Sequence, residues 1–381
     1  MGLSSALAKS DSIVRPLLVR MKPGYSVKLY SVARKRFIAL HGREVPGVEA
    51  RVPQEFSRIL WGIRFRSPIF NAAGMYKNAE GYAFCALAGA GAYLAGTTTA
   101  GKRKGNSSGG VALPFAPYPL SGAASNWLGL PNMGHASAAA LLATMPRVEG
   151  CPVGASVAFE PGAALETAFA GLVEGLELYQ KAGVDFIELN ESCPNTGGKF
   201  HRTAIDTIEP LLERLDELSR RFLRKRRRSL PVIVKFSNDT RPELVPVLLD
   251  ALCTMGYDGV NFGNTSTNYA ACKDGIVRQE QQLFEYFTAT YGGGVSGRPL
   301  AEKSLALTRA AAQALAVKPS PREFHIIRTG GVESAADIAV SLEAGASLAE
   351  WYTGYFERLA RNGTKVYDGI YRELTGGKSP K

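Results

Sequence analysis

Short apolar runs alternate with longer segments of helical periodicity along most of the chain. From residue 68 onward, eight apolar runs have the length of a buried strand. These predicted strands cover residues 69–73, 92–97, 152–157, 184–189, 231–235, 258–262, 323–328 and 347–352. Helical patterns fill the intervening segments 162–182, 203–226, 241–256 and 299–316. Eight strand–helix units predict an α/β fold, a (β/α)8 TIM barrel, because a doubly wound sheet normally has fewer strands.

The first 60 residues follow a different pattern. Within Ser26–Leu40, apolar side chains recur at spacings of three and four, which predicts an amphipathic helix with an apolar face of Val27, Tyr30, Ala33, Phe37 and Leu40. Basic residues lie mostly on the other faces of this helix. It could lie in a membrane interface or pack on the main domain. We therefore expect two domains, a basic N-terminal helical extension over 1–60 and a barrel over 61–381.

The net charge of +11 is unevenly distributed along the 381 residues. Residues 1–50 hold nine Lys or Arg and three Asp or Glu, so the extension carries more than half of the excess charge. A second basic run, Arg220–Arg228, lies at the end of the predicted helix 203–226, where the helix dipole favours cations. We interpret this run as a solvated helix end and expect no nucleic-acid partner.

No apolar run reaches the roughly 18 residues needed to span a bilayer, and the chain does not start like a secretory signal. The five cysteines are scattered without a Cys-x-x-Cys pair, which favours reduced thiols over disulfides or a zinc site. We expect a cytoplasmic protein, with peripheral contact of the extension to the inner face of the cell membrane as an additional possibility. No metal site is expected.

Unusual polar residues gather after the predicted strands, where TIM barrels carry their chemistry. The segment Glu188–Thr196 reads Glu-Leu-Asn-Glu-Ser-Cys-Pro-Asn-Thr and follows the fourth strand, while Lys235 closes the fifth. Comparable polar segments follow five of the other six strands: Asn71–Asn78, Gly96–Thr99, Asn264–Asn268, Thr329–Gly331 and Tyr352–Gly354.

The loops after the last two strands fit a phosphate site. Gly330-Gly331 and Thr353-Gly354 would let backbone N–H groups approach a phosphate closely. A phosphate site beside a buried lysine, without a metal-ligand cluster, indicates a phosphorylated cofactor that carries the chemistry, and FMN is the best candidate. Lys235 could place positive charge where a reduced flavin accumulates negative charge. The alternative is a barrel lysine paired with a carboxylate.

Several blocks of the sequence resemble the dihydroorotate dehydrogenase family, the flavoproteins of pyrimidine synthesis. They extend over roughly residues 60–360 in the order found in the family. The blocks are Asn71–Gly74, Lys77-Asn78, Asn126–Asn132, Asn190–Asn195, Val234-Lys235, Asn264-Thr265, Gly293–Leu300, Thr329–Gly331 and Tyr352–Gly354.

This resemblance implies oxidation of dihydroorotate to orotate on the route to UMP. The implied general base is Cys193, which removes the C5 proton while hydride leaves C6 for flavin N5. The implied substrate ligands are Lys77, Asn126, Leu130, Asn190, Asn195, Asn264 and Thr265. The implied FMN ligands are Ala73, Gly74, Lys77, Thr97, Asn190, Lys235, Gly297, Gly330, Gly331, Tyr352 and Thr353.

The resemblance leaves two electron acceptors open. Family members with a Cys base are generally soluble and lack an N-terminal extension, whereas quinone-reducing, membrane-associated members use Ser and carry one. This chain combines Cys193 with an extension, and Ser296–Leu300 followed by Lys303-Ser304 resembles the quinone-reducing members. We predict a quinone acceptor, with the extension as a lid on its site. The alternative acceptor is fumarate or another soluble oxidant.

Two other functions share the barrel and the flavin. A tRNA dihydrouridine synthase-like enzyme would need a continuous basic surface for RNA, but the charge is confined to the extension and one helix end. A flavin-binding barrel without catalysis would not explain the polar set around Asn126, Asn132 and Cys193. The loop Ala123–Gly134 is rich in Gly, Asn and Pro, as expected of a lid over a substrate.

Overall fold

The computed structural model describes residues 2–191 and 208–376. Its central feature is an eight-stranded parallel sheet in the order β3-β15-β14-β12-β11-β10-β9-β4. All eight predicted strands are present, and the TIM barrel is confirmed. Their bounds are β3 (Ile69–Asn71), β4 (Tyr93–Thr98), β9 (Val153–Val157), β10 (Phe186–Asn190), β11 (Val232–Ser237), β12 (Gly259–Asn264), β14 (His325–Thr329) and β15 (Leu348–Trp351).

A side chain helps to close the barrel between β3 and β4, the two strands at the ends of this order. The Asn71 amide of β3 donates to the Leu94 carbonyl of β4 at 2.8 Å, and its oxygen accepts from the Leu94 N–H at 3.2 Å. The amide thus pairs with β4 as a backbone peptide would. This role accounts for a buried polar residue at the end of an apolar strand.

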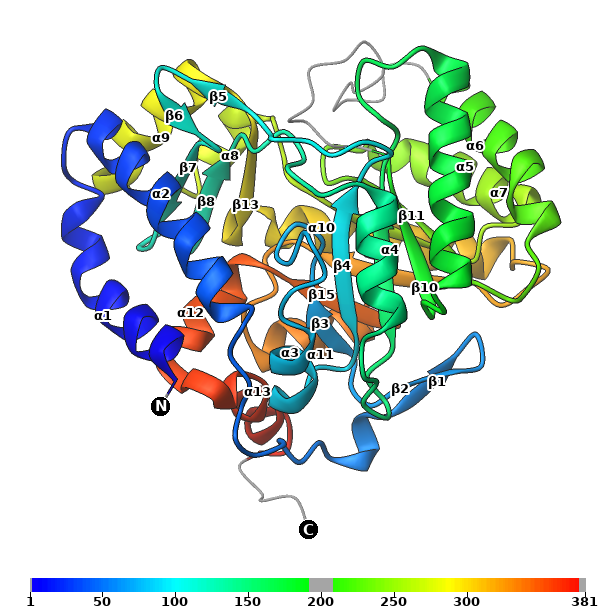
Figure 1. Ribbon diagram of the computed structural model, residues 1–381, viewed down its shortest axis with the longest axis horizontal. Helices are drawn as coiled ribbons and strands as arrows, with labels where there is room; N and C mark the ends of the chain where they lie inside the picture. The colour runs from blue at the N-terminus through cyan, green and yellow to red at the C-terminus, as the bar shows by residue number, and fades with distance from the viewer. Residues whose placement is uncertain (1, 192–207, 377–381) are drawn as a thin grey trace.

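Helices surround the sheet (Figure 1). They are α3 (Tyr82–Ala88), α4 (His135–Ala143), α5 (Leu165–Lys181), α6 (Glu209–Arg221), α7 (Val245–Met255), α10 (Ala301–Val317), α11 (Ala335–Glu343), α12 (Thr353–Asn362) and α13 (Val366–Leu374). Single 3-10 turns occur at Gln54–Phe56, Leu223–Lys225, Pro242–Leu244, Arg298–Leu300 and Gly363–Lys365. The four predicted helices correspond to α5, α6, α7 and α10, although residues 203–207 of the second lie outside the described residues.

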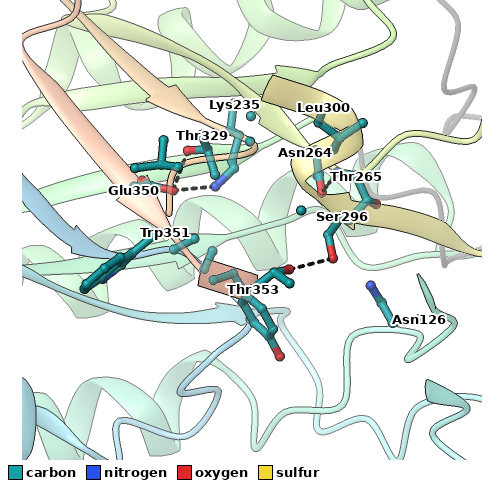
Figure 2. A pocket seen from close by; sticks show the side chains of 18 of the residues that line it. Asn126, Lys235, Asn264, Thr265, Ser296, Leu300, Thr329, Glu350, Trp351 and Thr353 are labelled. Carbon is teal, nitrogen blue, oxygen red and sulfur yellow. Dashed lines mark hydrogen bonds and ion pairs between the residues drawn. The ribbon is translucent and has the colours of Figure 1, made fainter. Parts of the chain in front are cut away.

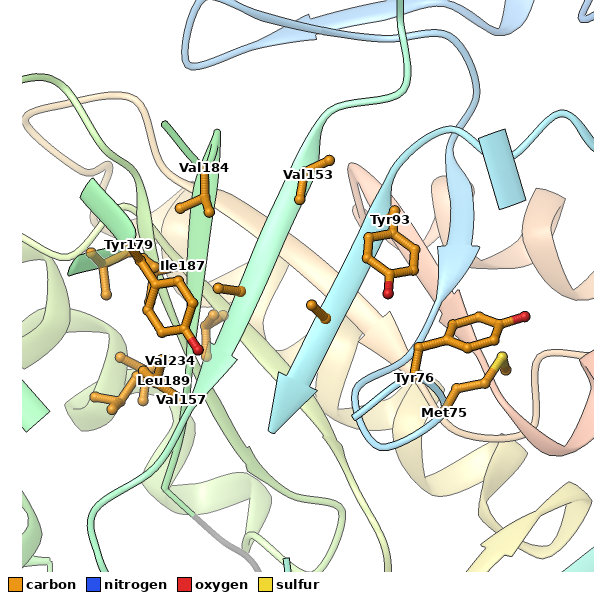
Figure 3. Close-up of a cluster of buried hydrophobic side chains, with 14 of the residues drawn as sticks. Met75, Tyr76, Tyr93, Val153, Val157, Tyr179, Val184, Ile187, Leu189 and Val234 are labelled. Atoms are coloured by element: carbon orange, nitrogen blue, oxygen red, sulfur yellow. The ribbon is translucent and has the colours of Figure 1, made fainter. Parts of the chain in front are cut away.

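Side chains of a barrel strand point alternately toward the surrounding helices and into the barrel interior. On β10, Ile187 and Leu189 belong to the large apolar cluster between sheet and helices, part of which is shown in Figure 3. Burying each such side chain stabilises the fold by about 1.5–3 kcal/mol. Phe186 belongs instead to a cluster of barrel-interior residues that also contains Phe65 from the β1 (Arg58–Leu60) and β2 (Ile63–Phe65) hairpin. Because side chains alternate along a strand, Glu188 and Asn190 follow Phe186 into the barrel interior.

A small antiparallel sheet stands beside the barrel mouth. Its order is β13-β8-β7, with β7 (Phe115–Tyr118), β8 (Ala123–Asn126) and β13 (Gly294–Gly297). The expectation that Ala123–Gly134 is a loop is therefore wrong for its first four residues, because hydrogen bonding to both neighbours makes them the central strand. Nearby elements are β5 (Ser107–Ser108), β6 (Val111–Ala112), α8 (Tyr269–Lys273) and α9 (Arg278–Tyr291).

Two helices form the start of the chain, α1 (Leu3–Leu18) and α2 (Pro23–His41). In Figure 1 they lie together on one side of the barrel, where α1 packs against α12 and α2 packs against β7 and α9. The predicted amphipathic helix is thus α2, and Val27 and Tyr30 are buried against the main body. Ala33 of the same apolar face is exposed. Among the described helices, none has the length and apolar character to cross a membrane.

The second basic run lies at the end of α6, as predicted. Arg220 pairs with Asp216 at 3.1 Å, and Arg221 pairs with Glu166 at 2.6 Å. Farther along the run, Arg226 pairs with Asp258 at 2.8 Å. These carboxylates neutralise much of the run, which explains how so many arginines fit at one helix end.

Candidate active site

A cavity opens at the C-terminal ends of the barrel strands and encloses about 1000 Å³, including space open to solvent. It is lined by every described residue that the sequence predicted to bind the substrate or the cofactor. Those residues are Ala73, Gly74, Lys77, Thr97, Asn126, Leu130, Asn190, Lys235, Asn264, Thr265, Gly297, Gly330, Gly331, Tyr352 and Thr353. Cys193 and Asn195 lie outside the described residues, and the chain is described up to Glu191, directly after β10.

Hydrogen bonds fix the amides along one wall of this cavity. Asn264 Nδ2 donates to Asn190 Oδ1 at 2.9 Å, and Asn190 Nδ2 donates to Thr97 Oγ1 at 3.1 Å. Three strands, β12, β10 and β4, supply this chain of polar groups. The Thr265 hydroxyl is buried, and the described residues give it no hydrogen-bond partner. Such a wall suits a small ligand that carries carbonyl and N–H groups, because an unsatisfied buried hydroxyl favours a polar partner.

Lys235 and Glu350 meet on the floor of the cavity (Figure 2), and Glu188 contacts the same lysine. Lys235 Nζ lies 2.7 Å from Glu350 Oε2 and 3.3 Å from Glu188 Oε1. The alternative interpretation of Lys235, a barrel lysine paired with a carboxylate, is confirmed, and the lysine also lines the cavity. Its role toward a flavin stays a prediction. Burial by itself would lower the pKa of Lys235, but the two glutamates raise it above its ordinary value. The ammonium is consequently retained although it is removed from water.

Two loops form a glycine-lined cradle at another part of the cavity. Gly331 has φ +69°, and a Cβ there would lie 2.4 Å from the Ala301 Cβ at the start of α10. A Cβ on Gly354 would lie 2.5 Å from the Val332 carbonyl oxygen. Helix α12 begins at Thr353, and among the described residues no side chain caps that end. Its first N–H groups and its dipole therefore favour an anion at this position.

Arg328 supports this cradle and was missed by the sequence analysis. It follows Ile327 on β14, is 2% exposed, and donates to the Ala301 carbonyl at 2.8 Å and to the Gly330 carbonyl at 3.5 Å. It also donates to Ser304 Oγ at 3.0 Å and to Ser341 Oγ at 2.8 Å. All four of these acceptors, two carbonyls and two hydroxyls, are uncharged. Burial lowers its pKa, although the charge of Asp337 opposes this effect. The sequence did contain a signal for this role, because an arginine within an otherwise largely apolar strand indicates a buried charge with specific partners.

A second pocket lies between α1, α2, α12 and the small sheet. It encloses about 1240 Å³, including space open to solvent. Apolar residues make up much of its lining: Leu7, Ala8, Ala33, Phe37, Ile38, Leu40, Pro117, Ala123, Ala124 and Phe356. Arg34 and Arg36 add positive charge, while Arg15 is paired with Asp11 at 3.2 Å and Glu357 at 3.0 Å.

The two pockets share a wall made of Phe115, Tyr352 and Thr353. The Arg34 guanidinium lies 5.4 Å from the centre of the Phe115 ring and 5.9 Å from that of Tyr352. It also donates a hydrogen bond to the Tyr352 hydroxyl. Cation–π contacts on two rings hold this arginine at the boundary. A group bound in the second pocket therefore lies next to residues that also line the first.

Comparisons with known proteins assign this arrangement to a family. The family described as dihydroorotate dehydrogenase matches residues 56–376. A dihydroorotate dehydrogenase (quinone) from Nocardia farcinica is 31% identical over 301 residues, which cover 78% of this chain and 74% of that protein. Another from Acidithiobacillus ferrooxidans is 29% identical over 374 residues, covering 96% and 95%.

A solved structure shows the same fold. The crystal structure of DHODH in complex with ferulenol from Eimeria tenella superposes with a TM-score of 0.72 at 23% identity, covering 91% of this chain and 90% of that chain. The family match extends over most of the chain, including the barrel and its cavity. The chain therefore belongs to the dihydroorotate dehydrogenase family of flavin-dependent oxidoreductases.

Proposed function

We propose that this protein oxidises dihydroorotate to orotate in pyrimidine synthesis, with FMN as cofactor and a quinone as electron acceptor. The observation that carries the proposal is the shared wall of Phe115, Tyr352 and Thr353 between a polar and a largely apolar pocket. An enzyme that moves electrons from a polar substrate to an apolar acceptor needs both sites beside one cofactor. The Nocardia and Acidithiobacillus relatives are both named as quinone enzymes.

The polar cavity fits FMN at both ends of that molecule. The cradle of Gly330, Gly331 and Gly354 with the start of α12 would hold the phosphate, since these residues line the cavity and the first N–H groups of α12 have no side-chain cap among the described residues. Thr97, Asn190 and Lys235 would hold the flavin ring. When bound, FMN accepts a hydride from the substrate and delivers electrons to the acceptor. The ammonium of Lys235 would favour negative charge on the ring.

The substrate would lie against the amide wall. Asn126, Asn190 and Asn264, with Lys77 and Thr265, would bind the ring carbonyl and N–H groups and the carboxylate of dihydroorotate. Fixing the ring in this way brings C5 and C6 into register with the base and the flavin, which is an entropic contribution to catalysis.

Cys193 would act as the base that removes the C5 proton. An ordinary thiol titrates near pH 8.5, so a modest lowering supplies thiolate at neutral pH. This role rests on sequence alone, because Cys193 lies outside the described residues. Asn190, three positions before Cys193 in the sequence, is the last residue of β10 and lines the cavity.

The second pocket would bind the quinone. Its tail would contact Leu7, Phe37 and Phe356, and arginine N–H groups could donate to its carbonyl oxygens. A small dicarboxylate such as fumarate would gain little from an apolar lining of this extent. The lining therefore favours the quinone over the soluble acceptor.

We propose that α1 and α2 also contact the membrane from which a quinone would come. Nine of the eighteen large apolar side chains exposed in the described residues belong to residues 3–32, including Ile13 at 69% and Leu17 at 66% exposure. Exposed Lys9, Arg20 and Lys22 accompany them. Apolar and basic side chains together favour the surface of an anionic membrane.

Rapid mixing tests the two half-reactions separately. FMN-loaded protein mixed with dihydroorotate should lose the visible absorbance of oxidised flavin within the turnover time. Subsequent mixing with a short-chain ubiquinone should restore the absorbance faster than fumarate does. Failure of dihydroorotate to bleach the flavin would overturn the proposed reaction. Faster recovery with fumarate would overturn only the acceptor.

A further inference from the structure

Two buried carboxyl groups share one ammonium on the floor of the active-site cavity. Glu188 of β10 and Glu350 of β15 are 1% and 0% exposed, and Lys235 of β11 between them is 3% exposed. The distances from Lys235 Nζ are 3.3 Å to Glu188 Oε1 and 2.7 Å to Glu350 Oε2. Figure 2 shows Lys235 and Glu350 with Thr329, which donates to Glu350 Oε2 at 2.9 Å.

Apart from Lys235, the described residues that hydrogen-bond to the two glutamates are uncharged. Glu188 accepts from Asn261 Nδ2 of β12 at 2.9 Å and from Ser156 Oγ of β9 at 3.3 Å. Among the described residues, the further charged residues that line this cavity are Lys77 and Glu333, and Glu333 is paired with Arg298 at 2.8 Å. Two ionised carboxylates beside one ammonium would leave a buried negative charge, which is strongly unfavourable.

Two observations indicate that the pair carries a proton. Burial raises the pKa of Glu188 to about 8, with the charge of Glu350 as the next cause, and Lys235 only partly opposes them. In addition, Glu350 Oε1 is buried, and the described residues give it no hydrogen-bond donor. A carboxyl proton shared between the glutamates would supply such a donor, and hydrogen bonding between the two side chains contributes to the shift at Glu188.

We propose that Glu188 and Glu350 hold a single proton between them and that this proton controls how the reduction potential of the bound flavin depends on pH. The inference rests on the proposed FMN site. With the proton in place, the trio of Lys235, Glu188 and Glu350 is neutral. Loss of the proton leaves one negative charge beside the flavin ring, which disfavours the electron-rich reduced form. The two glutamates are positioning residues that act through charge.

Single substitutions should remove the titration without changing the charge near neutral pH. In E350Q, Glu188 loses its acidic neighbour and ionises against Lys235, so the site stays neutral from pH 6 to 9. The same argument applies to E188Q with Glu350. Potentials of both variants should match the natural protein at pH 6 and exceed it at pH 9.

Spectroelectrochemical titration of the FMN-loaded proteins between pH 6 and 9 measures these potentials. Glu280→Gln is a matched control, because Glu280 is a buried carboxylate on α9 that binds the Leu120 and Ser121 N–H groups outside the cavity. It should retain the natural pH dependence. Equal pH dependence in the natural protein and both single variants would overturn the proposal, as would its loss in the control.

Infrared spectroscopy tests the proton without the cofactor. The FMN-free protein should show the band of a protonated buried carboxyl group at pH 6 that disappears on titration to pH 9. Either single substitution should remove the band. Its absence from the natural protein at pH 6 would contradict the shared proton even if FMN binds as proposed. If the band is present but the protein fails to bind FMN, the shared proton stands and only the proposed function is contradicted.

Discussion

At the scale of the residue, chemistry depends on a few side chains whose surroundings differ from those of the core. Glu188 and Asn190 follow Phe186 at every second position of β10, so one strand places an apolar, an acidic and an amide side chain into the barrel interior. Arg328 lies on the opposite face of β14 from Ile327 and supports the glycine-lined cradle from behind. Each of these roles predicts the result of a substitution.

Cys193→Ala should slow reduction of the bound flavin by dihydroorotate by about 100-fold or more, because general bases contribute factors of this size. Stopped-flow absorbance measures the rate, and the protein should remain yellow because FMN binding does not involve the thiol. Cys193→Ser should retain part of the activity with an optimum at higher pH, since a hydroxyl is the weaker acid. Cys253→Ala, a buried cysteine of α7, is the control and should keep the natural rate. Loss of FMN together with activity would instead indicate a structural role for Cys193.

Arg328→Gln should weaken FMN binding by roughly tenfold, equivalent to about 1.4 kcal/mol, because it removes a buried positive charge behind the phosphate cradle. Flavin fluorescence quenching measures the affinity. Riboflavin, which lacks the phosphate, is the control ligand, and its affinity should change much less. Equal losses for both ligands would show that Arg328 only maintains the shape of the loop.

At the scale of the element, α1 and α2 define the second pocket and carry much of the exposed apolar surface. Their packing against α12 and the small sheet brings this pocket next to the flavin cavity. One face of α2 is buried, while other positions line the pocket or face solvent. The helix thus combines structural and binding roles, and substitutions on different faces can separate them.

Ala33→Trp should slow flavin reoxidation by quinone at least tenfold while reduction by dihydroorotate stays within twofold, because the indole would fill the second pocket only. The two phases are measured by sequential mixing. Ala39→Trp is the matched control, since Ala39 is an exposed alanine of the same helix outside the pocket lining. Slowing of both half-reactions by Ala33→Trp would place the quinone elsewhere.

The double substitution Ile13→Glu with Leu17→Glu should reduce binding to vesicles that contain anionic phospholipid. It introduces two negative charges on the exposed apolar face of α1. Vesicle sedimentation at low salt measures the bound fraction. Val317→Glu is the control, because Val317 is 82% exposed at the end of α10. Equal binding of all three proteins would exclude this face as the contact.

At the scale of the whole molecule, buried histidines connect the N-terminal helices and α4 to the rest of the barrel. His41 of α2 lies 2.9 Å from Ser4 Oγ of α1 and 2.7 Å from the Tyr355 hydroxyl of α12. His135 at the start of α4 lies 2.9 Å from Thr98 Oγ1. Burial lowers the pKa of both histidines to about 4, against the opposing effect of nearby acidic residues.

The free energy of unfolding should therefore fall as the pH drops from 6.5 to 4. In this range the unfolded chain binds protons at His41 and His135 while the folded protein does not, so acid favours unfolding by up to about 3 kcal/mol per histidine. Urea unfolding at several pH values measures the slope. His41→Gln should make it shallower by about half, and an unchanged slope would show that His41 does not contribute.

The sequence predicted the barrel because buried parallel strands appear as continuous apolar runs, and all eight were found within a few residues. It also predicted the cavity lining, since the polar residues that follow such strands meet at one end of a barrel. The strand β8 was missed because its residues, Ala-Ala-Ser-Asn, lack the β-branched and aromatic side chains typical of strands. Arg328 was missed because most of its acceptors lie on α10 and α11, which only the fold brings against β14.

The sequence by itself determined the family, the barrel and the residues around the active site, because those properties depend on local periodicity and on polar residues at strand ends. Only the tertiary structure decided how charges and pockets combine. It brought Glu188 and Glu350, 162 positions apart, onto Lys235, and it placed Arg34 of α2 on Phe115 and Tyr352 between the two pockets. Contacts of this kind arise from strand order and helix packing, which no local pattern in the chain encodes.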